Sequence, residues 1–186
     1  MALPVPEVSR SLVHTRRVRF EAYKRDDGLW DIEAHLTDIK PFDYRLSSGI
    51  RAAGTPVHDM WIRLTIDASL NIVDAAASTD AMPYVGHCDA INPSYRSVIG
   101  LNLGRHFRLT VLERFAARAG CTHLTELLVQ FPTAAIQAMA GEKIDNEAHE
   151  GKKPFQLDRC HALDTASEAV RLYYPRWHRA AKTGTD

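Results

Sequence analysis

The chain has 186 residues, of which 45% are hydrophobic, and its 23 basic and 23 acidic residues give a formal net charge of zero. A chain of this length and composition is expected to form one domain with its own hydrophobic core. The balanced charge argues against nucleic acid or an anionic membrane surface as a partner.

The first 15 residues contain Pro4 and Pro6 and little periodicity, so they predict an N-terminal arm. They have neither the charged region nor the apolar region of a signal peptide. No part of the sequence approaches the roughly 20 apolar residues that span a membrane. Three cysteines cannot all pair within one chain, which favours free thiols. We therefore expect a cytoplasmic protein that does not enter a membrane.

Two β-hairpins are predicted next. Apolar and polar residues alternate, as in half-buried strands, over 18–22 and 30–36 and again over 60–66 and 71–77. Turn residues at 26–28 and 67–69 separate the strands of each pair. The intervening segment, residues 41–57, is rich in proline and glycine and predicts a loop. Two successive hairpins favour an antiparallel sheet of about four strands with one covered face.

Helical periodicity follows the sheet. Residues 94–118 predict one helix, or two shorter helices if Gly100 and Gly104 interrupt it. Gly120 is expected to end this stretch as a helix C-cap. Residues 124–139 predict a further helix with a kink or break at its proline.

The remaining segments complete an α+β architecture, in which C-terminal helices cover the antiparallel sheet. The charged residues 141–153 predict a mobile loop, and residues 160–174 predict a last helix or strand. We expect a single domain over residues 16–178, preceded by the arm at 1–15 and followed by a tail at 179–186. The open edges of such a sheet are where a homodimer would form.

The cysteines carry the clearest chemical pattern. Each has a histidine within two residues, in the pairs His87-Cys88, Cys121-Thr122-His123 and Cys160-His161. Thiolate and imidazole bind zinc and iron, and they also form the nucleophile–base pair of covalent catalysis. Free cysteines are also commonly buried as small apolar side chains. The pattern therefore predicts chemistry at sulfur without fixing its kind.

Cys121 is predicted at the start of a helix, where the partial positive charge of the helix end stabilises a thiolate. His58 and Asp59 precede the third strand, so they too lie at the end of an element. The other histidines, apart from those beside cysteines, show no such pattern: His14, His35, His106, His149 and His178.

Acidic residues on or near the second strand are expected to form an ordinary polar face. Alternation places Asp31 and Glu33 opposite the apolar residues, and Asp38 is assigned the same role. The sequence contains no C-x-x-C, H-E-x-x-H, P-loop, G-x-S-x-G or G-x-G-x-x-G motif, so no motif identifies the reaction.

Four blocks carry a resemblance to a known family: RDDGLWDIE at 25–33, PVHDM at 56–60, GCTHLTELL at 120–128, and PF through CHAL at 154–163. Over most of residues 14–178 the sequence resembles a bacterial family known as a domain of unknown function, number 2889. This resemblance implies no activity.

The order and spacing of other residues is similar to the iron–sulfur scaffold fold, the NifU N-terminal or IscU-like domain. In that family a Gly-x-Pro block leads to a Cys and an Asp, and two more cysteines follow. The resemblance implies a ligand set in the same order: His58, Asp59, Cys88 and Cys121. Because His58 stands in place of the first cysteine, this set suits zinc or mononuclear iron rather than an iron–sulfur cluster. Two further side chains could complete it: His123 and Cys160.

Three functions remain open. The first is a small metal-binding enzyme that uses the His/Asp/Cys/Cys site on a small organic substrate, such as an aromatic compound in catabolism. The second is a metal-free lyase or hydrolase, with Cys121 or Cys88 as nucleophile or acid and His123, His87 or His58 as base. The third is a non-catalytic metal or iron–sulfur scaffold, or a ligand-binding module. In either enzyme, aromatic side chains are expected to line the substrate pocket: Trp30, Tyr44, Trp61 and Tyr84.

Overall fold

The computed structural model describes residues 3–142 and 151–179. The chain divides into two compact units, residues 1–135 and 136–186, and each is described by itself. The predicted single domain over 16–178 stays a prediction. Most of the predicted mobile loop, together with His149 and the tail beyond Arg179, lies outside the described residues.

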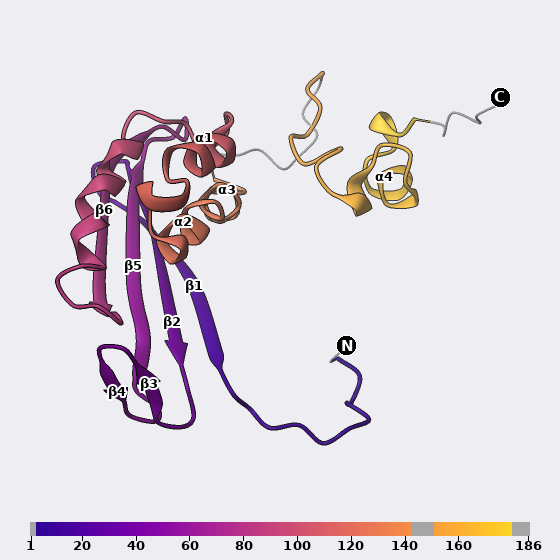
Figure 1. Cartoon of the computed structure of the whole chain (residues 1–186). Coiled ribbons are helices and arrows are strands. Elements are labelled where there is room, and N and C mark those ends of the chain that lie inside the picture. The colour runs from indigo at the N-terminus through magenta and orange to yellow at the C-terminus, as the bar shows by residue number, and fades with distance from the viewer. Residues whose placement is uncertain (1–2, 143–150, 180–186) are drawn as a thin grey trace. The chain divides into compact units, whose positions relative to one another are not determined.

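The first unit is built on a four-stranded antiparallel sheet in the order β1-β2-β5-β6 (Figure 1). Its strands are β1 (Thr15–Lys24), β2 (Trp30–Ile39), β5 (Pro56–Ile66) and β6 (Ile72–Ala81). Gly28 has a φ of +83°, which only glycine adopts at little cost, and this allows the tight turn between β1 and β2. The predicted antiparallel sheet of about four strands and the α+β class are confirmed.

A second, two-stranded sheet lies within residues 41–57, which the sequence predicted as a loop. It pairs β3 (Tyr44–Leu46) with β4 (Gly49–Arg51). Side chains of this hairpin hold the end of β6, because Arg51 Nη2 donates to the Met82 carbonyl at 2.7 Å. Strands of three residues are too short to show alternation in a sequence, which is why the hairpin was not predicted.

Helices cover one face of this sheet, and η1 runs along β6 (Figure 1). In chain order they are the 3₁₀ helix η1 (Asp89–Val98), α1 (Phe107–Arg114), η2 (Ala117–Ala119), α2 (Thr122–Leu128) and α3 (Phe131–Met139). The stretch predicted as one or two helices therefore forms three short ones. The predicted break is present, because Pro132 is the second residue of α3, where its missing N–H has no intrahelical partner to lose.

The alternation along β2 determines what each face carries. Burial alternates without exception over Trp30–Ile39, and the core side chains of β2 and β5 face the helices. They are Trp30, Ile32, Ala34, Leu36, Met60, Ile62, Leu64 and Ile66, none more than 5% exposed. Because opposite residues of an antiparallel pair point the same way, the paired residues Asp38 and His58 continue this covered face. Asp59 therefore belongs to the open face, as Asp31 and Glu33 do.

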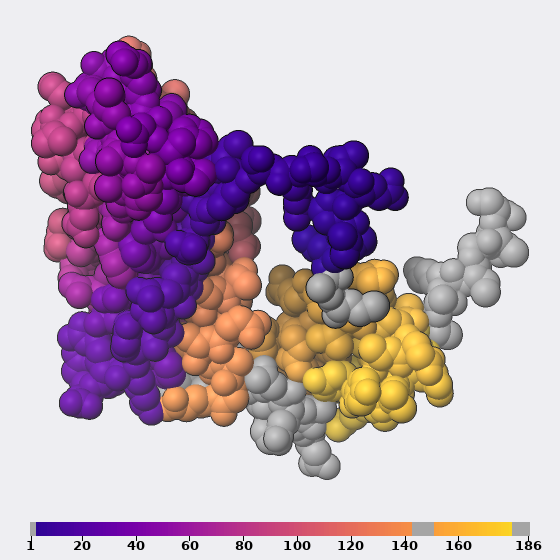
Figure 2. All heavy atoms as spheres, turned by 90° about the horizontal axis from the view of Figure 1, so that it is seen from below, coloured from indigo at the N-terminus to yellow at the C-terminus, as the bar shows by residue number. Residues whose placement is uncertain are grey.

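The N-terminal residues 3–14 form neither strand nor helix and are exposed along their length. Figure 2 shows this segment, in indigo, projecting from the sheet. None of the described helices combines the length and apolar composition needed to cross a membrane.

The second unit contains short elements: η3 (His161–Leu163), α4 (Glu168–Tyr173) and η4 (Pro175–Trp177). The segment predicted as one helix or strand over 160–174 is therefore two separate short helices. Ser167 caps α4 by accepting a hydrogen bond from the Val170 N–H at 3.2 Å, which satisfies one of the free amides at the helix start. Val170 and Leu157 are buried in this unit.

Gly120 is the C-cap residue of η2, as predicted, but its backbone conformation is not the one expected of a glycine C-cap. Its φ of −149° is extended rather than left-handed. The residue matters because a Cβ there would lie 2.6 Å from Phe115 Cβ and 2.7 Å from the Phe115 carbonyl oxygen. The absence of a side chain lets the chain pass close to Phe115 immediately before α2 begins.

We predict that Gly120→Ala destabilises the protein, because the new methyl group meets backbone that cannot rotate away. Overpacking of this kind costs about 1–3 kcal/mol. Denaturant unfolding followed by circular dichroism measures the effect. Gly104→Ala is the matched control, since a Cβ there meets only side chains, at 3.3 and 3.6 Å. Equal losses in the two variants would contradict this account.

Candidate metal centre

Asp38 is the organising side chain of the candidate site. It lies near the end of β2 on the covered face, and the residue is only 4% exposed. A buried carboxylate is costly unless hydrogen bonds and opposite charges compensate it. Asp38 obtains them from the N-terminal arm, from β1 and from β5.

Arg16 makes the strongest of these contacts. It lies opposite Asp38 in the β1–β2 register, and its Nε and Nη2 donate to Oδ1 and Oδ2, each at 2.8 Å. This two-point geometry is the strong form of an arginine–carboxylate pair. Nη1 of Arg16 also donates to Glu126 on α2 at 2.9 Å, so the guanidinium joins the sheet to the helix.

Two histidines complete the shell of Asp38. His14 Nε2, just before β1, donates to Oδ1 at 2.8 Å. His58 Nδ1, opposite Asp38 in the β2–β5 register, donates to Oδ2 at 3.0 Å. The carboxylate therefore orients the His58 ring and leaves its Nε2 without a proton when the ring is neutral.

The surroundings shift the pKa values of this cluster. Burial would raise the pKa of Asp38, but the hydrogen bonds and charge of Arg16, aided by His14 and His58, lower it to about 2. Burial lowers the pKa of His58, although Asp38 opposes that effect. Burial also lowers the pKa of His123, and the charges of His58 and Arg16 act in the same direction. Both rings are thus neutral at pH 7, which is the state that binds metals.

His123 comes from α2, whose start is held by the buried Tyr95. The Cys121 N–H donates to the Tyr95 hydroxyl at 2.8 Å, and that hydroxyl lies 3.1 Å from the Cys121 carbonyl. The close passage at Gly120 places this turn against the core. One residue into the helix, the His123 ring lies 4.0 Å from the ring of His58, measured between centroids.

Three donor atoms converge here from three elements. Asp38, His58 and His123 each offer one ligand atom, and these atoms lie within 4.8 Å of one another. His123 Nε2 lies 3.7 Å from Asp38 Oδ2. The 3.0 Å contact of His58 Nδ1 with the same oxygen is the hydrogen bond described above, so a metal on Nδ1 would have to replace that hydrogen bond. Two donors on one tetrahedral ion, each about 2.0–2.1 Å from it, are separated by about 3.3 Å. The spacing of the cluster therefore fits a metal ion with small side-chain adjustments.

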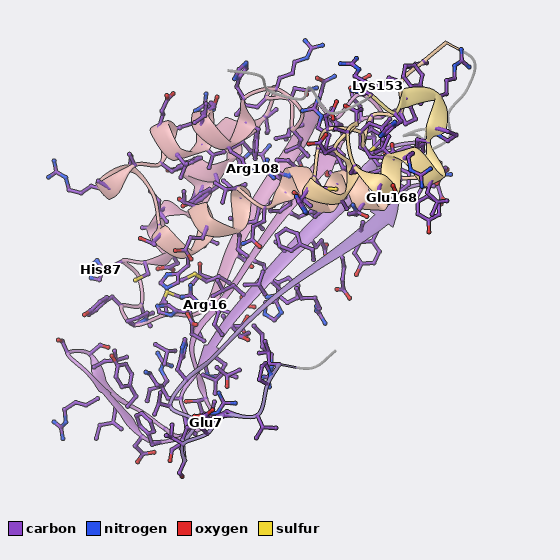
Figure 3. The ribbon with its side chains drawn as sticks, turned by 90° about the vertical axis from the view of Figure 1, so that its right-hand side faces the viewer. Glu7, Arg16, His87, Arg108, Lys153 and Glu168 are labelled. Carbon is purple, nitrogen blue, oxygen red and sulfur yellow. The ribbon has the colours of Figure 1, made fainter. Side chains whose placement is uncertain are left out.

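A cavity of about 520 Å³ opens beside the two imidazoles. Both His58 and His123 line it, as do Cys121 and Cys88. Cys121 Sγ lies 3.7 Å from His123 Nδ1, so the thiol contacts the ring on the side away from Asp38. Figure 3 shows Arg16 and His87 between the helices and the β3–β4 hairpin, the region of the cluster and its cavity.

The structure brings together His58, His123, Cys121 and Cys88 among the predicted site residues. It does not bring Asp59 to them. Asp59 is adjacent to His58 in a strand, so its side chain points to the opposite face, where it accepts a hydrogen bond from His35 at 2.7 Å.

The predicted aromatic lining is present only in part, since Tyr84 borders the cavity. Trp61 lies on the open face and stacks on His35 at 3.7 Å between ring centroids. Trp30 is a core residue eight positions from Asp38 along β2, or about 27 Å in a strand. Tyr44 lies in β3, with Lys40 Nζ 5.2 Å from its ring. Cys160 and His161 belong to the second unit, and Cys160 is exposed there.

Asp38 and the residues that hydrogen-bond to its carboxylate form one cluster with His123. Three residues of this cluster were not predicted as site residues: Asp38, Arg16 and His14. The signal for two of them is in the sequence. Asp38 continues the alternation Trp30, Ile32, Ala34, Leu36, and Arg16 precedes Val18 and Phe20 in the same way. A charged residue at the next position of an apolar alternation marks a buried ion pair or a site. No comparable pattern marks His14.

Comparison with known proteins identifies the family. The family model described as "Protein of unknown function (DUF2889)" matches residues 14–137, and the chain belongs to this family. The matched range contains the whole Asp38 cluster and its cavity. No curated protein and no solved structure matches the sequence. The resemblance to family 2889 is confirmed, whereas nothing in these comparisons supports the similarity to the iron–sulfur scaffold fold.

We predict that Asp38→Asn lowers stability by about 1–3 kcal/mol at pH 7, because Arg16 loses its charged partner in a buried setting. The pKa of Asp38 is lowered to about 2 on folding, so its contribution is complete above its unfolded pKa of about 3.9. That contribution disappears as the pH falls towards 2. Urea unfolding with EDTA present, at pH 7 and again near pH 3, measures it.

Asp59→Asn is the matched control for this variant. Asp59 also pairs with a histidine across the same two strands, but its side chain is 25% exposed compared with 5% for Asp38. We expect a smaller loss of stability from Asp59→Asn at pH 7. If Asp38→Asn were as stable as the wild type at pH 7, the organising role of Asp38 would be excluded.

Proposed function

We propose that this member of the DUF2889 family is a small metal-binding enzyme whose centre consists of Asp38, His58 and His123. The observation that carries the proposal is the convergence of these three donors, two of which, His58 and His123, line a cavity of about 520 Å³. Cavities of a few hundred cubic ångströms are the size that small-molecule substrates occupy.

The chemistry of the donors indicates the class of metal. Two imidazoles and one carboxylate suit zinc or Fe(II), and three protein ligands leave coordination positions open for a substrate. A metal held in this way would supply Lewis-acid activation of a substrate oxygen. The protein contributes a fixed geometry, because hydrogen bonds from His14 and Arg16 hold the Asp38 carboxylate in place.

A second candidate, a metal-free cysteine enzyme, is favoured by the contact between Cys121 and His123. In that case Cys121 acts as the nucleophile and His123 as its base, while Asp38 lies within reach of the other ring nitrogen. The same cavity then holds the substrate. The two candidates differ in whether the His123 ring binds a metal or a proton.

We predict that protein purified without an affinity tag contains about one equivalent of zinc or iron, measured by plasma mass spectrometry. His123→Ala and His58→Ala are expected to reduce this content to background, because each removes one of three ligands. His106→Ala is the control, since His106 is exposed and lies outside the cluster. Circular dichroism verifies that each variant is folded.

A metal content below about a tenth of an equivalent, after reconstitution with zinc and with Fe(II), would remove the metal centre from consideration. Equal metal content in wild type and His123→Ala would do the same for this ligand set. Asp38 is left out of this series because its substitution also affects stability.

For the cysteine enzyme, we predict that Cys121 in metal-free protein reacts with iodoacetamide faster than Cys160. Cys160 is the more exposed thiol, so faster reaction at Cys121 would reflect activation by His123 rather than access. His123→Ala should abolish the difference. Peptide mass spectrometry of the alkylated protein measures both rates. Slower reaction at Cys121 than at Cys160 would exclude this candidate.

A further inference from the structure

The cavity beside the metal centre has an unusual distribution of charge. Of its lining residues, Arg118 is the one that carries a full charge at every physiological pH, and no aspartate or glutamate lines it among the described residues. Asp38, behind the imidazoles, is already matched by Arg16. A metal at the centre would add further positive charge. The cavity is therefore suited to an anionic ligand.

Arg118 is available to such a ligand. Within the part of the chain that the structure describes, its guanidinium has no hydrogen bond or ion pair. Other arginines of the first unit already have hydrogen-bond partners. For example, Arg108 donates to the Val129 carbonyl and Arg51 donates to the Met82 carbonyl. Arginine binds carboxylates in a two-point geometry that fixes their orientation.

The backbone next to Arg118 is strained. Ala117 has a φ of +48°, in the left-handed region that residues with a Cβ rarely adopt. Strain of this kind costs about 1–3 kcal/mol and persists where surrounding structure or function requires it. The close passage at Gly120 follows three residues later. Together they fix the short turn that carries Arg118 to the cavity wall.

The rest of the wall is mostly apolar. Four side chains of the lining supply this surface: Met60, Pro83, Tyr84 and Ile91. An apolar lining with few polar groups at fixed positions is typical of sites for small organic ligands. Building on the function proposed above, we infer that the cavity binds a small organic carboxylate. Arg118 holds its carboxylate group, and the apolar wall contacts its body.

Fluorine NMR titration of the whole protein with 4-fluorobenzoate, before and after zinc loading, tests this inference. The neutral analogue 4-fluorobenzamide has nearly the same shape and is expected to bind about tenfold more weakly. Arg118→Gln should weaken 4-fluorobenzoate binding about tenfold and leave 4-fluorobenzamide binding unchanged. Arg105→Gln, an exposed arginine outside the cavity, should change neither.

Several outcomes would overturn the inference: no saturable binding of 4-fluorobenzoate in either form of the protein, equal binding of the two probes, or an unchanged affinity in Arg118→Gln. These outcomes are separate from the metal measurement. If the protein holds no metal but binds 4-fluorobenzoate through Arg118, the carboxylate site is supported and the metal centre is excluded. If the protein holds a metal but binds neither probe, the metal centre is supported and the carboxylate site is excluded.

Discussion

The burial of one ionised carboxylate, that of Asp38, determines how the candidate site is built. A charge that is 4% exposed must be matched, and the matching groups come from different parts of the chain. Arg16 also contacts Glu126, so the same pair joins the sheet to α2. The hydrogen bond from His58 fixes that ring. The contacts that make this charge tolerable are therefore also contacts that orient His58 and tie the sheet to the helix that carries His123.

The sheet carries a second histidine–carboxylate pair that shows what burial adds. His35 and Asp59 are joined across β2 and β5 at 2.7 Å; Asp59 directly follows His58 in β5, and His35 lies three positions before Asp38 in β2. The residue types and strands are the same, but the pair faces the uncovered side of the sheet. No third ligand meets it among the described residues, and no helix excludes water from it. The chemistry of the covered pair thus depends on the helix that brings His123 beside it.

The sheet could be predicted because period-two alternation is strong in β2 and β5, and because turn residues separate the strands. The same alternation assigned side chains to the two faces of the sheet. Continued by one step beyond Leu36, it places Asp38 on the buried face. The predicted ligand pair His58-Asp59 treated neighbours in the sequence as neighbours in space, which a strand forbids. The meeting of His123 with His58 depends on how α2 packs on the sheet. That packing follows from tertiary contacts of Tyr95 and Gly120, which no local pattern records.

The two candidate chemistries compete for one imidazole. His123 presents Nε2 to Asp38 and Nδ1 to Cys121, and a neutral ring has one proton and one free lone pair. A metal on Nε2 leaves the proton on Nδ1, so the ring can only donate towards Cys121 and cannot act as its base. Without a metal, Nε2 can donate to Asp38, and Nδ1 is then free to accept the thiol proton. Metal binding and thiol activation at His123 are therefore mutually exclusive, and the occupancy of Nε2 decides between them.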